Sequence, residues 1–262
     1  MGFIWTNSAE VALVKRLSLI FCAVCTIAFS LTSTAQSSPQ TTLPAQAAHS
    51  SQTLHISVPA ENVANLGTLK LKLQRYYACT CECGCYAKEL DHQAQVAIDF
   101  LDRRVAHKKP DEKLALVLDI DETALSNYKE MAAEDYGYVS SASDAWEDSA
   151  QAAAIPGTLR LYKEAQRLGV SVFFITGRGE AHRAATEQNL KSVGYTTWEG
   201  LTLRTAAQSK EATIAYKSGA RKAIVDAGYR IILNVGDQFS DLKGSPTAEF
   251  SVKLPNPFYY IP

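Results

Sequence analysis

Three runs of mainly apolar residues dominate the hydrophobic pattern of this 262-residue chain, and they predict buried strands. The runs cover residues 114–118, 170–175 and 229–236. Short apolar runs without polar alternation are typical of parallel strands that are covered on both faces. A further short strand is predicted near 200–203.

Between these runs, apolar residues recur every three or four positions, which predicts helices. Strands that alternate with helices form βαβ units with right-handed crossovers. The sequence therefore predicts an α/β, Rossmann-like fold in which helices flank a central parallel sheet. The predicted helices cover 65–77, 86–104, 158–168, 180–193 and a segment that ends at Gly228.

The first 35 residues have the pattern of a secretory signal peptide. Lys15 and Arg16 precede an apolar run from Leu17 to about Phe29, and small residues at 33–35 suit a cleavage site. The run is short for a bilayer span, which needs about 20 residues. A retained membrane anchor is the alternative. We expect cleavage, no stable membrane anchor afterwards, and a secreted or periplasmic protein.

The predicted domain organisation continues with a disordered linker at 36–53, which is rich in Ser, Thr, Gln, Ala and Pro. Residues 54–262 then form one sizeable domain. Within it, about 126–155 are too polar for a core and too aromatic for a linker. We expect a small, mainly helical cap insertion there, after the first strand. Its Tyr128 and Trp146 are candidates for stacking on a planar substrate group, with packing inside the insertion as the alternative.

Cysteines occupy alternate positions before the second predicted helix, and three interpretations stay open. An exported protein favours disulfides, although alternate cysteines do not pair easily within a regular helix or strand. A metal cluster is the second interpretation, although the spacing differs from the CxxC pairs of zinc sites. Free thiols are the third. The residues are Cys79, Cys81, Cys83 and Cys85.

The charges nearly balance, with a formal net charge of -1. This balance leaves no broad basic surface for a nucleic-acid polymer or an anionic membrane. Recognition of an anionic ligand therefore has to be local.

Polar residues follow each of the three main predicted strands at the point where the strand ends. Open α/β sheets bind ligands at these carboxyl ends. Because side chains alternate along a strand, we expect Asp119 and Asp121 to lie on the same side. An acidic strand-to-loop turn is the alternative. The polar residues are Asp119 and Asp121, Thr176 and Gly177, and Asp237 and Asp241.

Carboxylates at a buried strand end are costly unless a cation or a proton offsets them. Oxygen ligands without Cys or His favour Mg²⁺ over zinc. Beside such a cation, one carboxylate can attack phosphorus and a second can carry a proton to the leaving oxygen. A hydroxyl at Thr176 and backbone N–H groups after it suit phosphate oxygens. Lys217, near the start of the last predicted helix, is a candidate for neutralising the acidic residues and a bound anion. A solvated surface lysine is the alternative.

Four motifs, in the order in which they follow one another along the chain, resemble those of the haloacid dehalogenase (HAD) superfamily. Within this superfamily, they resemble the secreted acid phosphatases of the plant vegetative-storage-protein and bacterial class C type. The resemblance extends from about residue 90 to the end, including the tail 254–260, and does not cover the cysteines. The motifs are Asp119-Ile120-Asp121-Glu122-Thr123, Ile175-Thr176-Gly177-Arg178, Tyr216-Lys217-Ser218 and Asn234-Val235-Gly236-Asp237-Gln238-Phe239-Ser240-Asp241-Leu242.

This resemblance implies a Mg²⁺-dependent acid phosphatase that hydrolyses small-molecule phosphate monoesters. It implies that Asp119 is the nucleophile, which forms an aspartyl-phosphate, and that Asp121 is the general acid and base. Thr176, Gly177 and Lys217 would bind the phosphoryl group. The implied Mg²⁺ ligands are Asp119, the backbone carbonyl of Asp121, Asp237 and, directly or through water, Asp241.

Two other functions remain as alternatives. The first is a catalytically weak storage or binding protein with the same fold, since some storage-protein relatives are implied to have lost the nucleophile. Asp119 is present here, so we expect an enzyme. The second is a phosphotransferase or 5′-nucleotidase that uses the same residues. Dehalogenation is disfavoured because carbon–halogen cleavage needs no proton donor such as Asp121.

Overall fold

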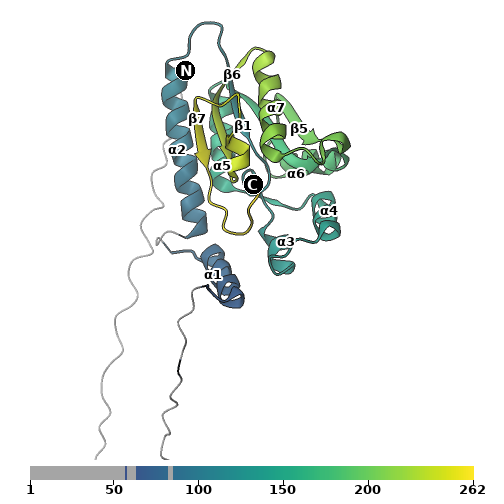
Figure 1. Cartoon of the computed structure of the whole chain (residues 1–262). Helices are drawn as coiled ribbons and strands as arrows, with labels where there is room; N and C mark the ends of the chain where they lie inside the picture. The colour runs from purple at the N-terminus through teal and green to yellow at the C-terminus, as the bar shows by residue number, and fades with distance from the viewer. Residues whose placement is uncertain (1–56, 58–62, 82–84) are drawn as a thin grey trace, which may run out of the picture. The chain divides into compact units, whose positions relative to one another are not determined.

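The computed structural model describes residues 57, 63–81 and 85–262 (Figure 1). The predicted signal peptide, 1–35, and the predicted linker, 36–53, lie outside the described residues. All described residues except Ser57 belong to one compact unit, Pro59–Pro262. In the described part of the chain, no helix is both long enough and apolar enough to cross a membrane.

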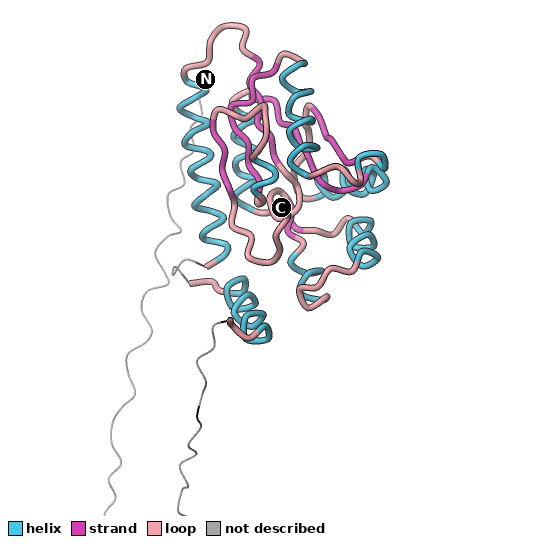
Figure 2. Tube along the Cα trace, in the orientation of Figure 1, coloured by secondary structure: helices cyan, strands magenta, loops and turns pink. Residues whose placement is uncertain are grey.

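A five-stranded sheet lies at the centre of this unit (Figures 1 and 2). Its order is β5-β4-β1-β6-β7, and every neighbouring pair is parallel. The predicted α/β fold with a central parallel sheet is therefore confirmed. The strands are β1 (Lys113–Leu118), β4 (Ser171–Gly179), β5 (Gly200–Arg204), β6 (Tyr229–Gly236) and β7 (Phe250–Lys253).

Alternate side chains of β1 enter two different cores, one on each face of the sheet. Leu114 and Leu116 belong to the larger core, which is completed by residues of α2, α5 and α6. Ala115 and Val117 belong to the smaller core, which contains residues of α7. Burial on both faces explains why the strand has no polar alternation. These helices are α2 (Tyr86–Ala106), α5 (Pro156–Arg167), α6 (Arg183–Ser192) and α7 (Thr213–Asp226).

Two details of the sheet and its helices were not predicted. β7 is a short edge strand with one buried side chain, so it has no apolar run for a sequence pattern to detect. α7 begins at Thr213 without a capping side chain, which places Lys217 in the second turn of the helix and not at its start.

Three further short helices lie after the cap. They are η1 (Glu180–His182), η2 (Ala206–Gln208) and α8 (Phe239–Leu242).

The first strand is followed by the predicted helical insertion. The chain leaves the sheet through β2 (Leu125–Ser126) and returns through β3 (Ala153–Ala154), which pairs with β2 in antiparallel fashion. Between these strands lie α3 (Tyr128–Ala133) and α4 (Ser140–Ser149), and Figure 1 shows both helices beyond one end of the sheet. We refer to residues 126–155 as the cap.

Helix α1 (Leu66–Ala78) precedes the cysteines and contacts the cap. The ring of Tyr77 stacks on that of Tyr128, with centroids 3.3 Å apart. Lys70 forms an ion pair of 2.5 Å with Asp135. The first helix therefore packs against the cap.

The cysteine segment lies between α1 and α2. Cys81 is disulfide-bonded. In a separate contact, its Sγ lies 3.0 Å from the Sγ of Cys79. The buried Cys85 thiol donates to the carbonyl oxygen of Cys79 at 3.1 Å. Cys83 lies outside the described residues. The disulfide interpretation therefore applies to Cys81.

Candidate active site

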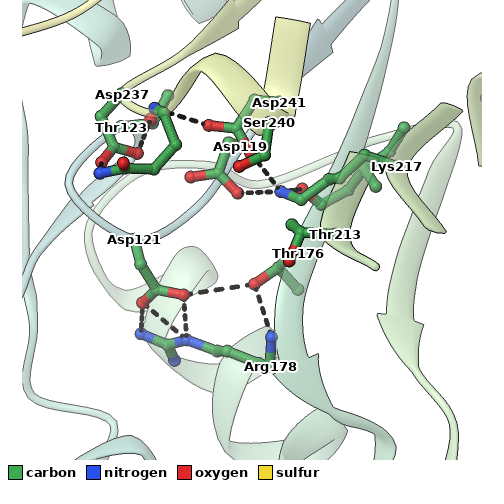
Figure 3. A network of polar contacts seen from close by, with 12 residues as sticks. Asp119, Asp121, Thr123, Thr176, Arg178, Thr213, Lys217, Asp237, Ser240 and Asp241 are labelled. Atoms are coloured by element: carbon green, nitrogen blue, oxygen red, sulfur yellow. Dashed lines mark hydrogen bonds and ion pairs between the residues drawn. The ribbon is translucent and has the colours of Figure 1, made fainter. Parts of the chain in front are cut away.

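Three carboxylates meet where β1 and β6 end, as Figure 3 shows. Asp119 follows β1, and Asp237 and Asp241 follow β6. All three residues are buried, and one carboxylate oxygen from each lies within 4.8 Å of the others. We refer to these residues as the carboxylate cluster.

Lys217 reaches the carboxylate cluster from α7. Its Nζ lies 2.5 Å from Oδ1 of Asp119 and 2.9 Å from Oδ1 of Asp241, and it donates to the carbonyl of Ile175 at 2.7 Å. Burial opposes its charge, but the two aspartates outweigh burial and raise the pKa of Lys217 above its usual value. Lys217 is 3% exposed, so it is not a solvated surface lysine.

One ammonium faces three buried carboxylates, which leaves an excess of negative charge. Burial raises the pKa of Asp119 well above its usual value; Lys217 opposes this shift, and Asp241 and Asp237 add to it. Burial and Asp241 also raise the pKa of Asp237. A divalent cation would remove this repulsion. The donors are all carboxylate oxygens, so the cluster could hold a hard metal ion.

Neighbouring side chains fix the two aspartates after β6. Oδ2 of Asp237 accepts hydrogen bonds from Nε2 of Gln238 and Nδ2 of Asn256, both at 2.7 Å. Its Oδ1 accepts from the Thr123 hydroxyl at 3.1 Å. Oδ2 of Asp241 accepts from the backbone N–H of Gln238 at 2.9 Å. The two carboxylates are therefore held by their sequence neighbour Gln238 and by the distant residues Thr123 and Asn256.

The segment 236–246, which contains α8 and which we call the Asp241 loop, depends on two further residues. A Cβ atom at Gly236 would overlap the Asp241 carboxylate, so only glycine fits there. Arg221 of α7 is fully buried and donates to four backbone carbonyls of the loop. A basic residue within a helix gives no sequence signal for such a role, and Arg221 was not predicted. The four carbonyls belong to Asp241, Lys243, Gly244 and Pro246.

The side chain of Asp121 lies apart from the carboxylate cluster (Figure 3). Its Oδ1 accepts from Nε and Nη2 of Arg178 at 2.9 and 2.7 Å, and its Oδ2 from the Thr176 hydroxyl at 3.3 Å. Burial opposes ionisation, but Arg178 outweighs it and lowers the pKa of Asp121. Asp119 and Asp121 both line one cavity, although their carboxylates have different partners.

Asn127 connects Asp121 to the cap. Its Nδ2 donates to Oδ1 of Asp121 at 2.8 Å and to Oε2 of Glu122 at 3.1 Å. Its Oδ1 accepts from Nε1 of Trp146 at 2.8 Å. Glu122 also accepts a hydrogen bond from the Tyr259 hydroxyl at 3.1 Å. Burial raises the pKa of Glu122 to about 8, and the charges of Asp121 and Asp237 add to this shift. Trp146 therefore orients a partner of Asp121.

A cavity of about 650 Å³ opens over these groups. It is lined by the sheet end, the cap and the tail residues 258–261. Thr176 is fully buried and is not among the lining residues. Tyr128, which stacks on Tyr77, is not among them either. The predicted site residues that line the cavity are Asp119, Asp121, Trp146, Gly177, Lys217, Asp237 and Asp241.

The chain matches the family model described as HAD superfamily, subfamily IIIB (acid phosphatase), over residues 36–262. It belongs to this family. The predicted resemblance is therefore confirmed.

The chain is also similar to plant proteins of two kinds. Acid phosphatase 1 of Solanum lycopersicum is 42% identical over 148 residues, which cover 55% of this chain and 58% of that protein. Vegetative storage protein 1 of Arabidopsis thaliana is 33% identical over 217 residues, or 79% of this chain and 77% of that protein. The chain thus spans 58 to 61% of the length of the tomato phosphatase and of a soybean stem glycoprotein that it also matches.

A solved structure has the same architecture. The class C acid phosphatase from Bacillus anthracis with tungstate bound superposes with a TM-score of 0.61 and 25% identity. The superposition covers 73% of this chain and 85% of that chain. The subfamily IIIB fold thus extends over most of the described residues.

Proposed function

We propose that this chain is a Mg²⁺-dependent acid phosphatase that hydrolyses phosphate monoesters through an aspartyl-phosphate on Asp119. The observation that carries the proposal is the carboxylate cluster with Lys217 at the floor of the cavity. Membership of subfamily IIIB and the match to the tomato acid phosphatase support the same activity.

Asp119 supplies the nucleophile. A carboxylate oxygen attacks phosphorus and forms an acyl phosphate, while the bond from phosphorus to the ester oxygen breaks. Asp119, Asp237 and Asp241, with the Asp121 backbone carbonyl, would hold Mg²⁺. The bound ion would keep Asp119 ionised and offset the charge on the phosphoryl oxygens. Lys217 Nζ and the backbone N–H of Gly177 would bind those oxygens.

Asp121 supplies and removes protons. It gives a proton to the departing alkoxide and then takes one from the water that hydrolyses the acyl phosphate. Thr176 and Arg178 favour its ionised form, which suits the second step. A general acid works best when its pKa lies near the operating pH, so a lowered pKa of Asp121 suits an acidic working range.

We also propose that the protein is secreted or periplasmic and acts on small-molecule substrates. The signal-peptide pattern of the first 35 residues supports export. The disulfide at Cys81 suits an oxidising compartment. The soybean relatives named stem glycoproteins are consistent with this location.

Phosphate release from p-nitrophenyl phosphate tests the proposal. We expect turnover that EDTA abolishes and added Mg²⁺ restores. Asp119→Asn should lower kcat by on the order of 10³-fold or more while the thermal unfolding temperature changes little. The matched control is Asp226→Asn, which removes an exposed carboxylate that pairs with Lys222 on the surface of α7.

Similarity to a vegetative storage protein favours a second candidate, a catalytically weak storage protein with the same fold. The same measurement separates the two candidates. Undetectable phosphate release by the folded protein with Mg²⁺ would favour storage. Turnover that survives in Asp119→Asn would instead exclude the aspartyl-phosphate mechanism.

A further inference from the structure

The two carboxylate oxygens of Asp121 have different surroundings. Oδ1 accepts three short hydrogen bonds, from Nε and Nη2 of Arg178 at 2.9 and 2.7 Å and from Nδ2 of Asn127 at 2.8 Å. The hydrogen bonds that Oδ2 accepts are longer, 3.2 Å from Nε of Arg178 and 3.3 Å from the Thr176 hydroxyl. A carboxylate oxygen offers about two lone-pair sites, so three N–H donors leave Oδ1 no site for a proton. Oδ2 is therefore the oxygen of Asp121 that can carry one.

The amide of Asn127 has one orientation that satisfies its partners. Nδ2 donates to Oδ1 of Asp121 and, at 3.1 Å, to Oε2 of Glu122. The amide oxygen accepts from the indole N–H of Trp146 at 2.8 Å. A rotated amide would place its oxygen against two carboxylates and its NH₂ group against the indole, which has a donor and no acceptor. Asn127 therefore always presents a donor to Asp121.

Glu122, which accepts from this amide, is itself held from the tail. Its side chain is buried, its Oε1 accepts from the backbone N–H of Asn127 at 2.6 Å, and its Oε2 accepts from the Tyr259 hydroxyl at 3.1 Å. The backbone of Glu122 has a φ of 54°, a conformation that residues other than glycine adopt only when their surroundings enforce it. The cap, through Trp146, and the tail, through Tyr259 and Glu122, thus both fix Asn127.

The side chain of Asn127 does not serve the helix that follows it. Asn127 is the N-cap residue of α3, but its side chain makes no capping hydrogen bond. Its polar atoms contact Asp121, Glu122 and Trp146 instead. Substitution by alanine therefore removes the contact with Asp121 and leaves the cap of α3 as it is.

We propose that Asn127 is a positioning residue for proton transfer by Asp121. Asn127 and Arg178 together occupy Oδ1, so Oδ2 carries the proton. As the bond from phosphorus to the ester oxygen breaks and the phosphoryl group passes to Asp119, the proton moves from Oδ2 to the departing oxygen. This inference rests on the proposed phosphatase activity and adds the atom that carries the proton and the residue that orients it.

Two aryl esters with different leaving groups test this role. p-Nitrophenyl phosphate and phenyl phosphate are alike around the reacting bond, but phenolate is the poorer leaving group and depends more on a proton from Asp121. Asn127→Ala should raise the ratio of kcat/KM for p-nitrophenyl phosphate to that for phenyl phosphate by roughly tenfold, because Oδ2 is no longer held for the transfer. A general loss of folded protein or of phosphate binding would affect both esters and leave the ratio unchanged.

Two further variants complete the experiment. Asn65→Ala is the matched control, since Asn65 caps the exposed start of α1 and does not line the cavity; it should keep the wild-type ratio. Trp146→Phe removes the N–H that holds the Asn127 amide and keeps an aromatic ring. It should raise the ratio in the same direction as Asn127→Ala, but by less, because the donor to Asp121 is still present.

The outcomes separate the two proposals. Equal losses for both esters in a folded Asn127→Ala protein, or no loss at all, would overturn the positioning role and leave the phosphatase activity intact. If Asn127→Ala does not fold, an unchanged ratio in Trp146→Phe would overturn it. Failure of the wild-type protein to hydrolyse either ester would overturn the proposed function and this inference with it.

Discussion

The buried guanidinium of Arg178 and the half-buried carboxylate of Asp121 form an ion pair, with Nη2 2.7 Å from Oδ1. The two side chains are 1% and 24% exposed. The pair joins the end of β4 to the loop after β1, and Asn127 adds a contact from the cap. Loss of Arg178 leaves the partly buried Asp121 carboxylate without its cationic partner.

Removal of Arg178 alone should therefore be strongly destabilising. We expect Arg178→Met to lower the free energy of unfolding by about 3 kcal/mol, measured by urea denaturation near neutral pH. The double variant Arg178→Met, Asp121→Asn should recover part of this loss, because no unpaired charge remains. Strictly additive effects of the two substitutions would show that the pair is not coupled.

Arg221 should stabilise the Asp241 loop through geometry and not through charge. Lysine keeps the charge but cannot donate to four carbonyls at once, so Arg221→Lys should cost about 2 kcal/mol of unfolding free energy. It should also raise the Mg²⁺ concentration needed for half-maximal activity. Lys222→Arg, on the exposed side of the same helix, is the control and should change stability by less than about 0.5 kcal/mol. Equal stability of the two variants would contradict the role of Arg221.

His182 should make the attachment of the cap depend on pH. Its hydrogen bond to Asp148 raises its pKa; burial opposes this shift, and the charges of Glu147, Asp148 and Asp144 add to it. Because folding raises the pKa of His182, its protonated ring stabilises the folded protein. This stabilisation is fully present below the pKa of histidine in the unfolded chain, about 6.5, and is lost as pH rises through the pKa of His182 in the folded protein. His182→Gln should therefore cost about 0.5–1 kcal/mol near pH 5.5 and less near pH 9.

The measurement for His182 is a pair of thermal unfolding curves, wild type and variant, across that pH range. Asp148→Asn removes the same contact from the cap side and should show the same trend. A difference in stability that stays constant with pH would exclude an ionic contribution of His182.

Several parts of the site were predictable because each follows from a local pattern. Apolar runs identified the strands, and the polar residues after them identified Asp119, Asp237 and Asp241. Parallel pairing then brings their carboxyl ends to one edge without further information. Lys217 was predictable from its motif, although the bounds of its helix were not.

Other parts depend on contacts between residues that are distant in the sequence. Arg178 and Asn127 look like ordinary polar residues until the fold places both against Asp121. Arg221 has no pattern that separates it from a surface arginine, yet it is fully buried. The stacking of Tyr128 on Tyr77 depends on α1, which lies more than one helix away along the chain.

The sequence alone determined the α/β class and the types of residue that meet at the sheet edge. It also determined the central position of the aspartates that follow the first strand. These features could be predicted because hydrophobic periodicity and strand direction are local properties. Only the tertiary structure decided which carboxylates share a cluster, which one pairs with Arg178, and which residues of the cap face the cavity. These are matters of side-chain direction, and packing between distant segments sets that direction.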